Sequence, residues 1–168
     1  MTGQLRAATP HDVDALWALE QACFSPGADR FNRRQISYLI RHAKAVTGVV
    51  EQNSHLTGYA TLLVRARERL GRIYSLCVHP SARGAGLGED LVDFLEDKAL
   101  ELGLERLVLE VRVDNDAALT LYARLGFERT AWLDDYYSDG CAAWKMSKPL
   151  TPLTPLGPEH QHRGERDQ

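Results

Sequence analysis

The segment Ile73-Tyr-Ser-Leu-Cys-Val-His-Pro-Ser-Ala-Arg-Gly-Ala-Gly-Leu-Gly88 decides the fold of this 168-residue chain. Its first half is a β-rich run that ends at Pro80. Glycines then occupy alternate positions, Gly84, Gly86 and Gly88, and the residues after them have the apolar spacing of a helix. We therefore predict a strand, a glycine turn and a helix in immediate succession.

The glycine turn has the properties of a phosphate-binding loop. Glycine tolerates positive φ and lets a ligand approach the backbone, and the first turn of a helix has unpaired N–H groups with a partial positive charge. Such a site binds phosphate. Arg83 stands at the edge of the turn, where its charge can reach a second phosphate. The alternative is that the glycines only allow tight packing between strand and helix.

Two common phosphate loops do not match this spacing. A Walker loop ends in Gly-Lys-Ser/Thr, whereas Gly88 is followed by Glu89 and Asp90. The dinucleotide fingerprint requires a third glycine three residues after the second, and those positions hold Glu89 or Leu91 here. A nucleotide-binding protein of either class is therefore disfavoured.

The composition is that of one soluble globular domain, with 44% apolar and 26% charged residues. The formal net charge of −3 gives no reason to expect nucleic acid or an acidic membrane surface as a partner. No apolar run is long enough to span a membrane, and no apolar signal core follows Arg6. We expect a cytoplasmic protein, present as a monomer or a homodimer.

The three cysteines, Cys23, Cys77 and Cys141, are an odd number without the paired spacing of a metal site. We expect them to be reduced and buried. The histidines are scattered along the chain, so no metal site is predicted.

Apolar periodicity divides residues 1–150 into the strands and helices of one α/β domain. The predicted strands cover residues 4–8, 45–51, 56–64, 72–78, 105–112, 127–132 and 142–148, and the predicted helices begin near Pro10, Arg33, Leu87 and Asn115. The side chains expected to face the core include Ala15, Leu16, Leu19, Ile36, Tyr38, Leu39, Leu91, Leu95 and Leu102. Residues 151–168 contain too little apolar surface to fold and are predicted to be a disordered tail.

Two connections leave a choice of roles open. Phe24 and Phe31, around the turn between the first two helices, fit either the core, which is commoner, or a substrate contact. The connector Arg65-Ala66-Arg67-Glu68-Arg69 fits either a solvated loop, which is also commoner, or a patch for an anionic ligand.

The glycine turn, Arg83-Gly84-Ala85-Gly86-Leu87-Gly88 after a Val-x-Pro strand end, resembles the pyrophosphate loop of the GCN5-related N-acetyltransferases (GNAT family), Arg/Gln-x-x-Gly-x-Gly/Ala. A second region resembles the RimI-type protein N-terminal acetyltransferases of that family, through Leu109-Glu110-Val111-Arg112, Asn115, Ala117-Ala118, Leu121-Tyr122 and Leu125-Gly126-Phe127. The resemblance covers about residues 4–150. It implies the GNAT fold, a mostly antiparallel mixed sheet of about seven strands with splayed parallel central strands, flanked by four helices.

The resemblance also implies acetyl-CoA as cosubstrate and no metal. Its pantetheine amides would pair with the free backbone of Leu76, Cys77 and Val78. Its pyrophosphate would lie against Arg83, Gly84, Ala85, Gly86, Leu87, Gly88 and Glu89, and the site would be completed by Asn115, Ala118 and Tyr122. A competing idea, that Cys77 carries the acetyl group transiently, is disfavoured because direct transfer does not require it.

Amine acetylation requires a proton acceptor and a proton donor. An amine attacks a thioester only as the free base, and a positioned donor assists the departure of the thiolate. In RimI-type enzymes a glutamate in the Leu-Glu-Val-Arg strand is the base and a tyrosine on the next helix is the acid, which implies Glu110 and Tyr122 here. One alternative is a Glu110 that simply faces solvent, and another is a different base or water alone. For Tyr122 the alternative is a side chain that only packs on Leu119 and Leu125.

The acceptor side matches the RimI type less well. Residues 23–29, Cys-Phe-Ser-Pro-Gly-Ala-Asp, stand where RimI-type proteins have an aromatic-rich Pro-Trp segment. The resemblance implies that Tyr136 and Tyr137 line the acceptor site. Phe24, in the loop between the first two helices, is a further candidate substrate contact. Nearby acids, which either attract a cationic amine or face solvent, are Asp134, Asp135 and Asp139. We expect a primary amine as acceptor, either a protein N-terminus or a small molecule; a non-catalytic acetyl-CoA sensor is the alternative.

Overall fold

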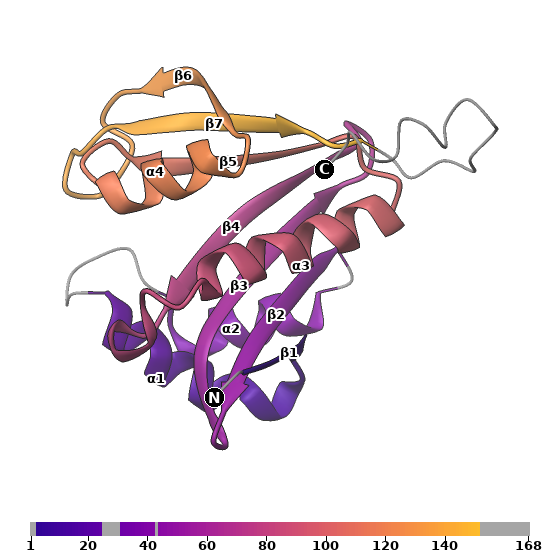
Figure 1. Ribbon diagram of the computed structural model, residues 1–168, viewed down its shortest axis with the longest axis vertical. Coiled ribbons are helices and arrows are strands. Elements are labelled where there is room, and N and C mark those ends of the chain that lie inside the picture. The colour runs from indigo at the N-terminus through magenta and orange to yellow at the C-terminus, as the bar shows by residue number, and fades with distance from the viewer. Residues whose placement is uncertain (1–2, 25–30, 43, 152–168) are drawn as a thin grey trace.

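Seven strands form one sheet in the order β1-β2-β3-β4-β5-β7-β6 (Figure 1). The computed structural model describes residues 3–24, 31–42 and 44–151. The strands are β1 (Gln4–Ala7), β2 (Ala45–Gln52), β3 (His55–Arg65), β4 (Leu70–Val78), β5 (Arg106–Arg112), β6 (Glu128–Leu133) and β7 (Ala143–Pro149). The helices in these ranges are α1 (Val13–Cys23), α2 (Arg33–Arg41), α3 (Leu87–Glu101) and α4 (Asp116–Arg124), with short 3₁₀ turns η1 (Pro10–Asp12) and η2 (Pro80–Ala82). The predicted mixed sheet with flanking helices is confirmed.

The central strands β4 and β5 are parallel neighbours over a short distance only. Four residue pairs join them, from Leu70↔Arg106 to Ile73↔Leu109. Beyond these pairs β4 remains paired with β3 and β5 with β7, and the two strands diverge (Figure 1). The β3–β4 register shifts at the same place and skips Tyr74. Because such a bulge bends its strand, it accounts for the divergence that begins there.

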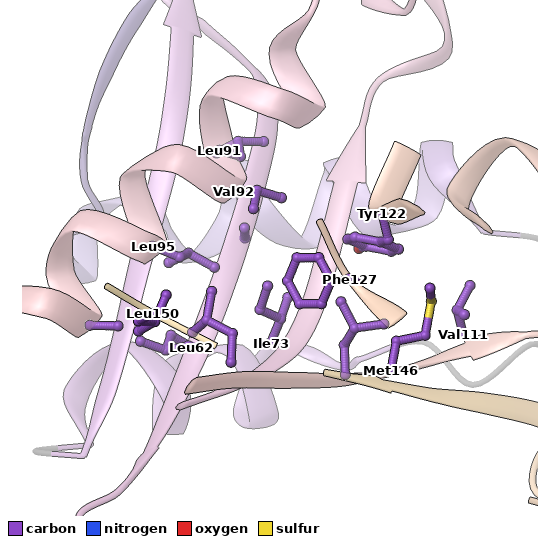
Figure 2. Close-up of a cluster of buried hydrophobic side chains, with 14 of the residues drawn as sticks. Leu62, Ile73, Leu91, Val92, Leu95, Val111, Tyr122, Phe127, Met146 and Leu150 are labelled. Atoms are coloured by element: carbon purple, nitrogen blue, oxygen red, sulfur yellow. The ribbon is translucent and has the colours of Figure 1, made fainter. Parts of the chain in front are cut away.

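Helices cover both faces of the sheet, so two apolar cores form. On one face, Leu91, Val92 and Leu95 of α3 pack in a cluster with Leu62 and Phe127 (Figure 2). On the opposite face, α1 and α2 contribute to a second core that contains Leu16, Leu19, Ile36, Val49, Tyr59 and Cys77. The divergent end of β4 therefore lies between two helical layers.

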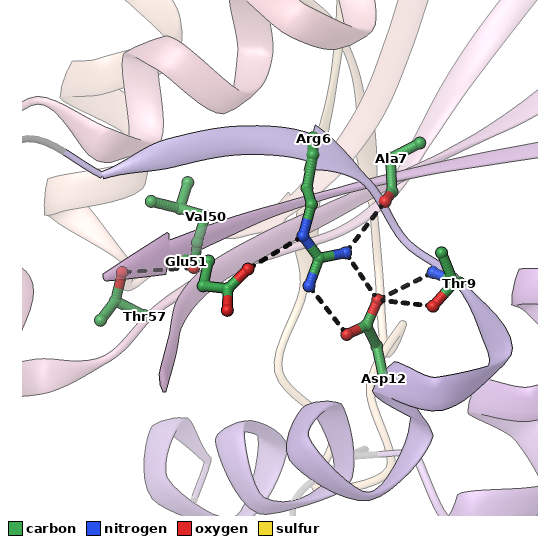
Figure 3. A network of polar contacts seen from close by, with 7 residues as sticks. All are labelled: Arg6, Ala7, Thr9, Asp12, Val50, Glu51 and Thr57. Carbon is green, nitrogen blue, oxygen red and sulfur yellow. Dashed lines mark hydrogen bonds and ion pairs between the residues drawn. The ribbon is translucent and has the colours of Figure 1, made fainter. Parts of the chain in front are cut away.

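An ion-pair network joins β1 to the start of the first helical segment. The guanidinium of Arg6 donates to both carboxylate oxygens of Asp12, at 2.9 and 3.0 Å, and to Oε1 of Glu51 on β2 at 3.1 Å (Figure 3). Asp12 also accepts a hydrogen bond from the backbone N–H of Thr9 at 2.8 Å, which caps η1. The hydrogen bonds from Arg6 lower the pKa of the Asp12 carboxyl.

Cys23 and Cys77 form a disulfide that joins the C-terminal end of α1 to β4. The prediction that all three cysteines are reduced is therefore wrong for these two. Their sequence positions are 54 apart, and only the packing of α1 on the sheet brings their Cα atoms to 6.5 Å. Cys141 is free and half-buried.

Three side chains predicted to face the core are exposed instead. Tyr38 is 61% exposed, Leu102 is 54% exposed, and Ala15 is also exposed. In α2 the inner stripe is formed by Ile36 and Leu39, which leaves Tyr38 on the outer side. Leu102 lies just after the last residue of α3.

The predicted tail, residues 151–168, lies outside the described residues apart from Thr151, and so do residues 25–29 of the first helix-to-helix turn. Within the described ranges, no helix has both the length and the apolar character needed to cross a membrane.

Candidate active site

The three glycines of the loop have different structural roles. Gly84 and Gly86 adopt φ values of +87° and +83°, and a Cβ atom added to either meets no heavy atom within 4 Å. Gly86 also caps α3, whose first intrahelical bond runs from the N–H of Asp90 to the carbonyl of Gly86. A Cβ added to Gly88, in contrast, lies 3.2 Å from Leu121 Cδ2 on α4. The packing interpretation therefore holds for Gly88, whereas Gly84 and Gly86 form an open surface of backbone next to free helical N–H groups.

Arg83 is bound to the end of β4. Its Nε donates a hydrogen bond to the carbonyl oxygen of Val78 at 3.0 Å. Within the described residues its two Nη groups make no hydrogen bond, so they remain donors for an anion. This contact sets Arg83 between the strand end and the glycine turn, beside the position predicted for the pyrophosphate.

The residues predicted to meet the pantetheine lie on the divergent end of β4. Leu76 and Val78 pack toward the core beneath α3, and Cys77 enters the core beneath α1 and α2. The sulfur of Cys77 is bonded to Cys23 on that second face. The arrangement therefore gives no support to Cys77 as an acetyl carrier.

Glu110 lies on β5 immediately after its last residue paired with β4, and it does not face solvent. Its side chain is 13% exposed, and both Nε and Nη2 of Arg72 lie 2.8 Å from its Oε1 atom. The solvent-facing alternative is therefore wrong. Within the described residues Oε2 makes no hydrogen bond, which leaves one carboxylate oxygen able to accept a proton.

Arg72 connects Glu110 to the predicted acceptor side. Its Nη2 also donates to the hydroxyl of Tyr136 at 3.1 Å, and its guanidinium carbon lies 4.9 Å from the ring centre of Tyr74. Burial lowers the pKa of Arg72, but the hydrogen bond and charge of Glu110 outweigh it and raise the pKa above its ordinary value. Arg72 is therefore a permanent positive charge that fixes the carboxylate and one tyrosine.

Tyr122 lies on the other side of β5, in the core beneath α3. It is 6% exposed and makes an edge contact with Phe127, with ring centres 5.5 Å apart (Figure 2). Burial raises the pKa of its phenol, and the neighbouring Tyr137 adds to the rise. Tyr122 belongs to the same apolar core as Leu119 and Leu125, so it does contribute to packing. A protonated phenol that makes no hydrogen bond within the described residues is also an available donor.

Asn115 caps α4 through its side chain. Its Oδ1 atom accepts a hydrogen bond from the N–H of Ala118 at 3.1 Å. The amide nitrogen of Asn115 stays available as a donor, and Ala118 packs against the edge of the main core. Both residues lie at the start of α4, whose later turn carries Tyr122.

Tyr136 and Tyr137 pack edge to face beside the Glu110 carboxylate. Their ring centres are 4.9 Å apart, and burial raises the pKa of Tyr137 to about 12. The ring of Tyr137 also lies 5.0 Å from the guanidinium carbon of Arg112. Among the neighbouring acids, Asp139 is held by Arg112 at 2.8 Å.

Phe24 and Phe31, which flank the first helix-to-helix turn, lie on this side of the sheet. Phe24 is half-buried against the second core, which agrees with the commoner interpretation of it as a core residue. Phe31 is also partly buried there, and its ring stacks on Tyr74 with centres 5.3 Å apart.

Sequence reasoning missed Arg72 and Tyr74 as parts of this site. Both residues stand in a strand with apolar neighbours, and an arginine inside such a run is the signal that was available. Arg72 reaches Glu110 only because β5 lies beside β4, and the residue pattern of β4 alone does not show which strand is its neighbour.

Known proteins match this chain over most of its length. The model described as "Acetyltransferase (GNAT) family" matches residues 13–127. The chain belongs to this family. The expected membership is thus confirmed, and the RimI-like character is supported by relatives of that type.

Two curated relatives of this GNAT protein are named for different substrates. Mycothiol acetyltransferase of Streptomyces avermitilis is 33% identical over 129 residues, which cover 73% of this chain and 42% of that protein. A Bacillus subtilis protein described as a ribosomal protein bS18-alanine N-acetyltransferase is 31% identical over 130 residues, which cover 76% of this chain and 82% of that protein. The chain thus spans less than half the length of the mycothiol enzyme.

Solved structures share the fold of this GNAT protein. The ribosomal-protein-S18-alanine N-acetyltransferase of Escherichia coli superimposes with a TM-score of 0.79 at 24% identity, over 92% of this chain and 97% of that one. The yncA protein of Salmonella typhimurium, whose structure contains its cofactor acetyl-CoA, superimposes with a TM-score of 0.78 at 21% identity, over 94% and 99%.

Proposed function

We propose that this protein transfers the acetyl group of acetyl-CoA directly to a primary amine, and that the preferred amine is the α-amino group of a peptide or protein. One observation carries the proposal. β4 and β5 part after Ile73 and Leu109, with the open glycine turn at the end of β4 and the Glu110 carboxylate at the point of divergence. Membership in the GNAT family and the acetyl-CoA found in the yncA structure support the choice of cosubstrate.

The described residues fit acetyl-CoA. The open backbone at Gly84 and Gly86, the free N–H groups at the start of α3 and the Nη groups of Arg83 suit a diphosphate. The edge of β4 at residues 76–78 has no partner among the described strands on the side of β5, so it offers backbone donors and acceptors to the pantetheine amides. When bound, acetyl-CoA supplies the activated acetyl thioester.

Glu110 acts as the base in this proposal. Its Oε2 atom takes a proton from the amine, directly or through one water molecule, while Arg72 holds Oε1. An α-amino group has a pKa of about 7.7–8.0 and needs only modest help near neutral pH, whereas a lysine amine near 10.4 needs far more. A carboxylate in this position therefore suits an N-terminal amine better than a lysine side chain.

Tyr122 acts as the acid. Its phenol is buried, and its raised pKa keeps it protonated through the physiological range. It donates a hydrogen bond to the departing sulfur from the side of the sheet opposite to Glu110. The two side chains thus serve opposite faces of β5, one for the amine and one for the thiol.

A small-molecule amine is the second candidate acceptor, because the Streptomyces avermitilis relative is a mycothiol acetyltransferase. To separate the two, the full chain is incubated with acetyl-CoA and three acceptor sets: peptides with free N-termini, the same peptides with blocked N-termini and internal lysines, and small amines. Thiol release and mass spectrometry measure transfer. Acetylation at the α-amino group of the free peptides supports the proposal. Transfer to small amines alone, or CoA binding without transfer to any set, overturns it.

A further inference from the structure

A groove of about 790 Å³ runs between α2 and the hairpin that joins β3 to β4. It lies on the face of the sheet that α1 and α2 cover. Aromatic and apolar side chains form part of its lining, among them Phe31, Tyr38, Leu63 and Tyr74. Its volume is within the range of sites that bind small ligands or peptide segments.

The lining of this groove is strongly cationic. Arg34, Lys44, Arg65 and Arg67 line it and are exposed, and Glu68 is the single carboxylate among the described lining residues. Within the described part of the chain, none of these four cations has a carboxylate within ion-pair distance.

Two neighbouring arginines outside the groove are paired. Arg33, next to Arg34 on α2, lies 2.9 Å from Asp14. Arg69, on the same hairpin as Arg67, lies 3.1 Å from Glu105. Four unpaired cations thus gather in one groove of a protein whose net charge is −3.

The groove adjoins the candidate active site through Arg72. Arg72 and Tyr74 line it, and Arg72 is the residue that holds Glu110 at 2.8 Å. Phe31 lines it as well and stacks on Tyr74. A chain whose amino group meets Glu110 can therefore continue past Arg72 into the groove.

We propose that this groove binds the part of the acceptor peptide that follows its N-terminal residues, and that this part is acidic. The proposal rests on the proposed function and names its substrate class. Asp and Glu side chains complement the four unpaired cations, and the aromatic lining covers the apolar stems of an extended peptide. Complementary charge of this kind selects among substrates by differences in affinity. In this proposal Arg65 and Arg67 of the connector form the anionic-ligand patch, which was the rarer interpretation of that segment, while Arg69 stays paired with Glu105.

The test uses peptides with the same first two residues followed by four acidic, four neutral or four basic residues. We expect kcat/KM to fall from acidic to neutral to basic, with about 10-fold or more between the extremes, mainly through KM and less at high salt. The double variant Arg65→Glu/Arg67→Glu should reverse the order. The control Arg41→Glu changes an exposed arginine of α2 that does not line the groove, and it should preserve the order.

The outcomes separate this inference from the proposed function. Acetylation of all three peptides at equal rates, or an order that Arg65→Glu/Arg67→Glu leaves intact, overturns the groove assignment alone. Inhibition by inorganic phosphate or a short RNA as strong as that by a blocked acidic peptide identifies a general anion surface and also overturns it. Failure to acetylate any free N-terminus overturns the proposed function and the groove assignment with it.

Discussion

Arg72 on β4 and Glu110 on β5 form an ion pair across the point at which the two strands part. Two guanidinium nitrogens lie 2.8 Å from one carboxylate oxygen, and both side chains are largely buried. The ion pair therefore links two strands whose backbones are paired at only four positions. Because a bound arginine fixes the carboxylate, the second oxygen has a defined direction for proton transfer.

Replacement of Glu110 by glutamine tests the role of this carboxylate. Glutamine keeps the shape and one acceptor for Arg72 but cannot take a proton, so we expect kcat for peptide acetylation to fall about 10²–10⁴-fold. Binding of CoA should change little. Steady-state kinetics and calorimetry measure the two effects.

Glu105→Gln is the matched control, because Glu105 pairs with Arg69 at an exposed position. That variant should retain wild-type kcat. If Glu110→Gln also retains it, water or another group is the base.

Tyr122→Phe removes one hydroxyl that makes no hydrogen bond within the described residues, so the fold should tolerate it. Loss of a general acid is expected to lower kcat by about 10²-fold or more. Since burial raises the pKa of this phenol, wild-type activity should not decline as pH approaches the ordinary tyrosine pKa of 10. A loss of wild-type activity below pH 10 that disappears in Tyr122→Phe would contradict a raised pKa for Tyr122.

Gly86→Ala tests the phosphate loop against a matched glycine on the same helix. Gly86 and Gly103 lie at opposite ends of α3, have φ values of +83° and +76°, and have no heavy atom within 4 Å of an added Cβ. Each substitution should cost about 1–2 kcal/mol of folding free energy, because alanine is strained at positive φ. Only Gly86→Ala should weaken CoA binding, by about 10-fold or more, since its methyl group enters the diphosphate position. Equal CoA affinity in the two variants, measured by calorimetry, would place the diphosphate elsewhere.

The Arg6–Asp12 pair predicts how stability changes in acid. Arg6 lowers the pKa of Asp12, so the folded state holds the proton more weakly than the unfolded state does. The pair's contribution is therefore complete above the ordinary carboxyl pKa near 4 and is lost as pH falls through the lower folded-state pKa. Asp12→Asn should cost roughly 1–3 kcal/mol at neutral pH, and the two proteins should converge in strong acid.

Urea unfolding at several pH values measures this convergence. Asp14→Asn removes an exposed partner of Arg33 and should have little effect at any pH. A constant difference between wild type and Asp12→Asn down to strong acid would show that the ion pair does not govern the acid response.

Local pattern was enough to predict the strands, the helices and the loop. In β5, Leu107, Leu109 and Val111 alternate with Val108 and Glu110, and the structure sends the first three into the core beneath α3. The motif around the glycine turn marked the start of α3 for a similar reason, because helix starts and positive φ have short-range signatures.

Contacts between distant segments could not be predicted in this way. Arg72 and Glu110 are 38 positions apart, and the two disulfide cysteines are 54 apart. The bulge at Tyr74 depends on the register with β3, and the groove depends on how α2 meets the β3–β4 hairpin. Each is a property of the assembled sheet and is absent from the pattern of any one strand.

The most direct test of the proposed CoA site is a crystal structure of the protein with bound CoA. We predict the diphosphate within hydrogen-bond distance of backbone N–H groups in residues 84–89, and the pantetheine arm along residues 76–78 of β4, with its sulfur between Glu110 and Tyr122. Density for CoA on another surface, or a sulfur remote from both side chains, would contradict it.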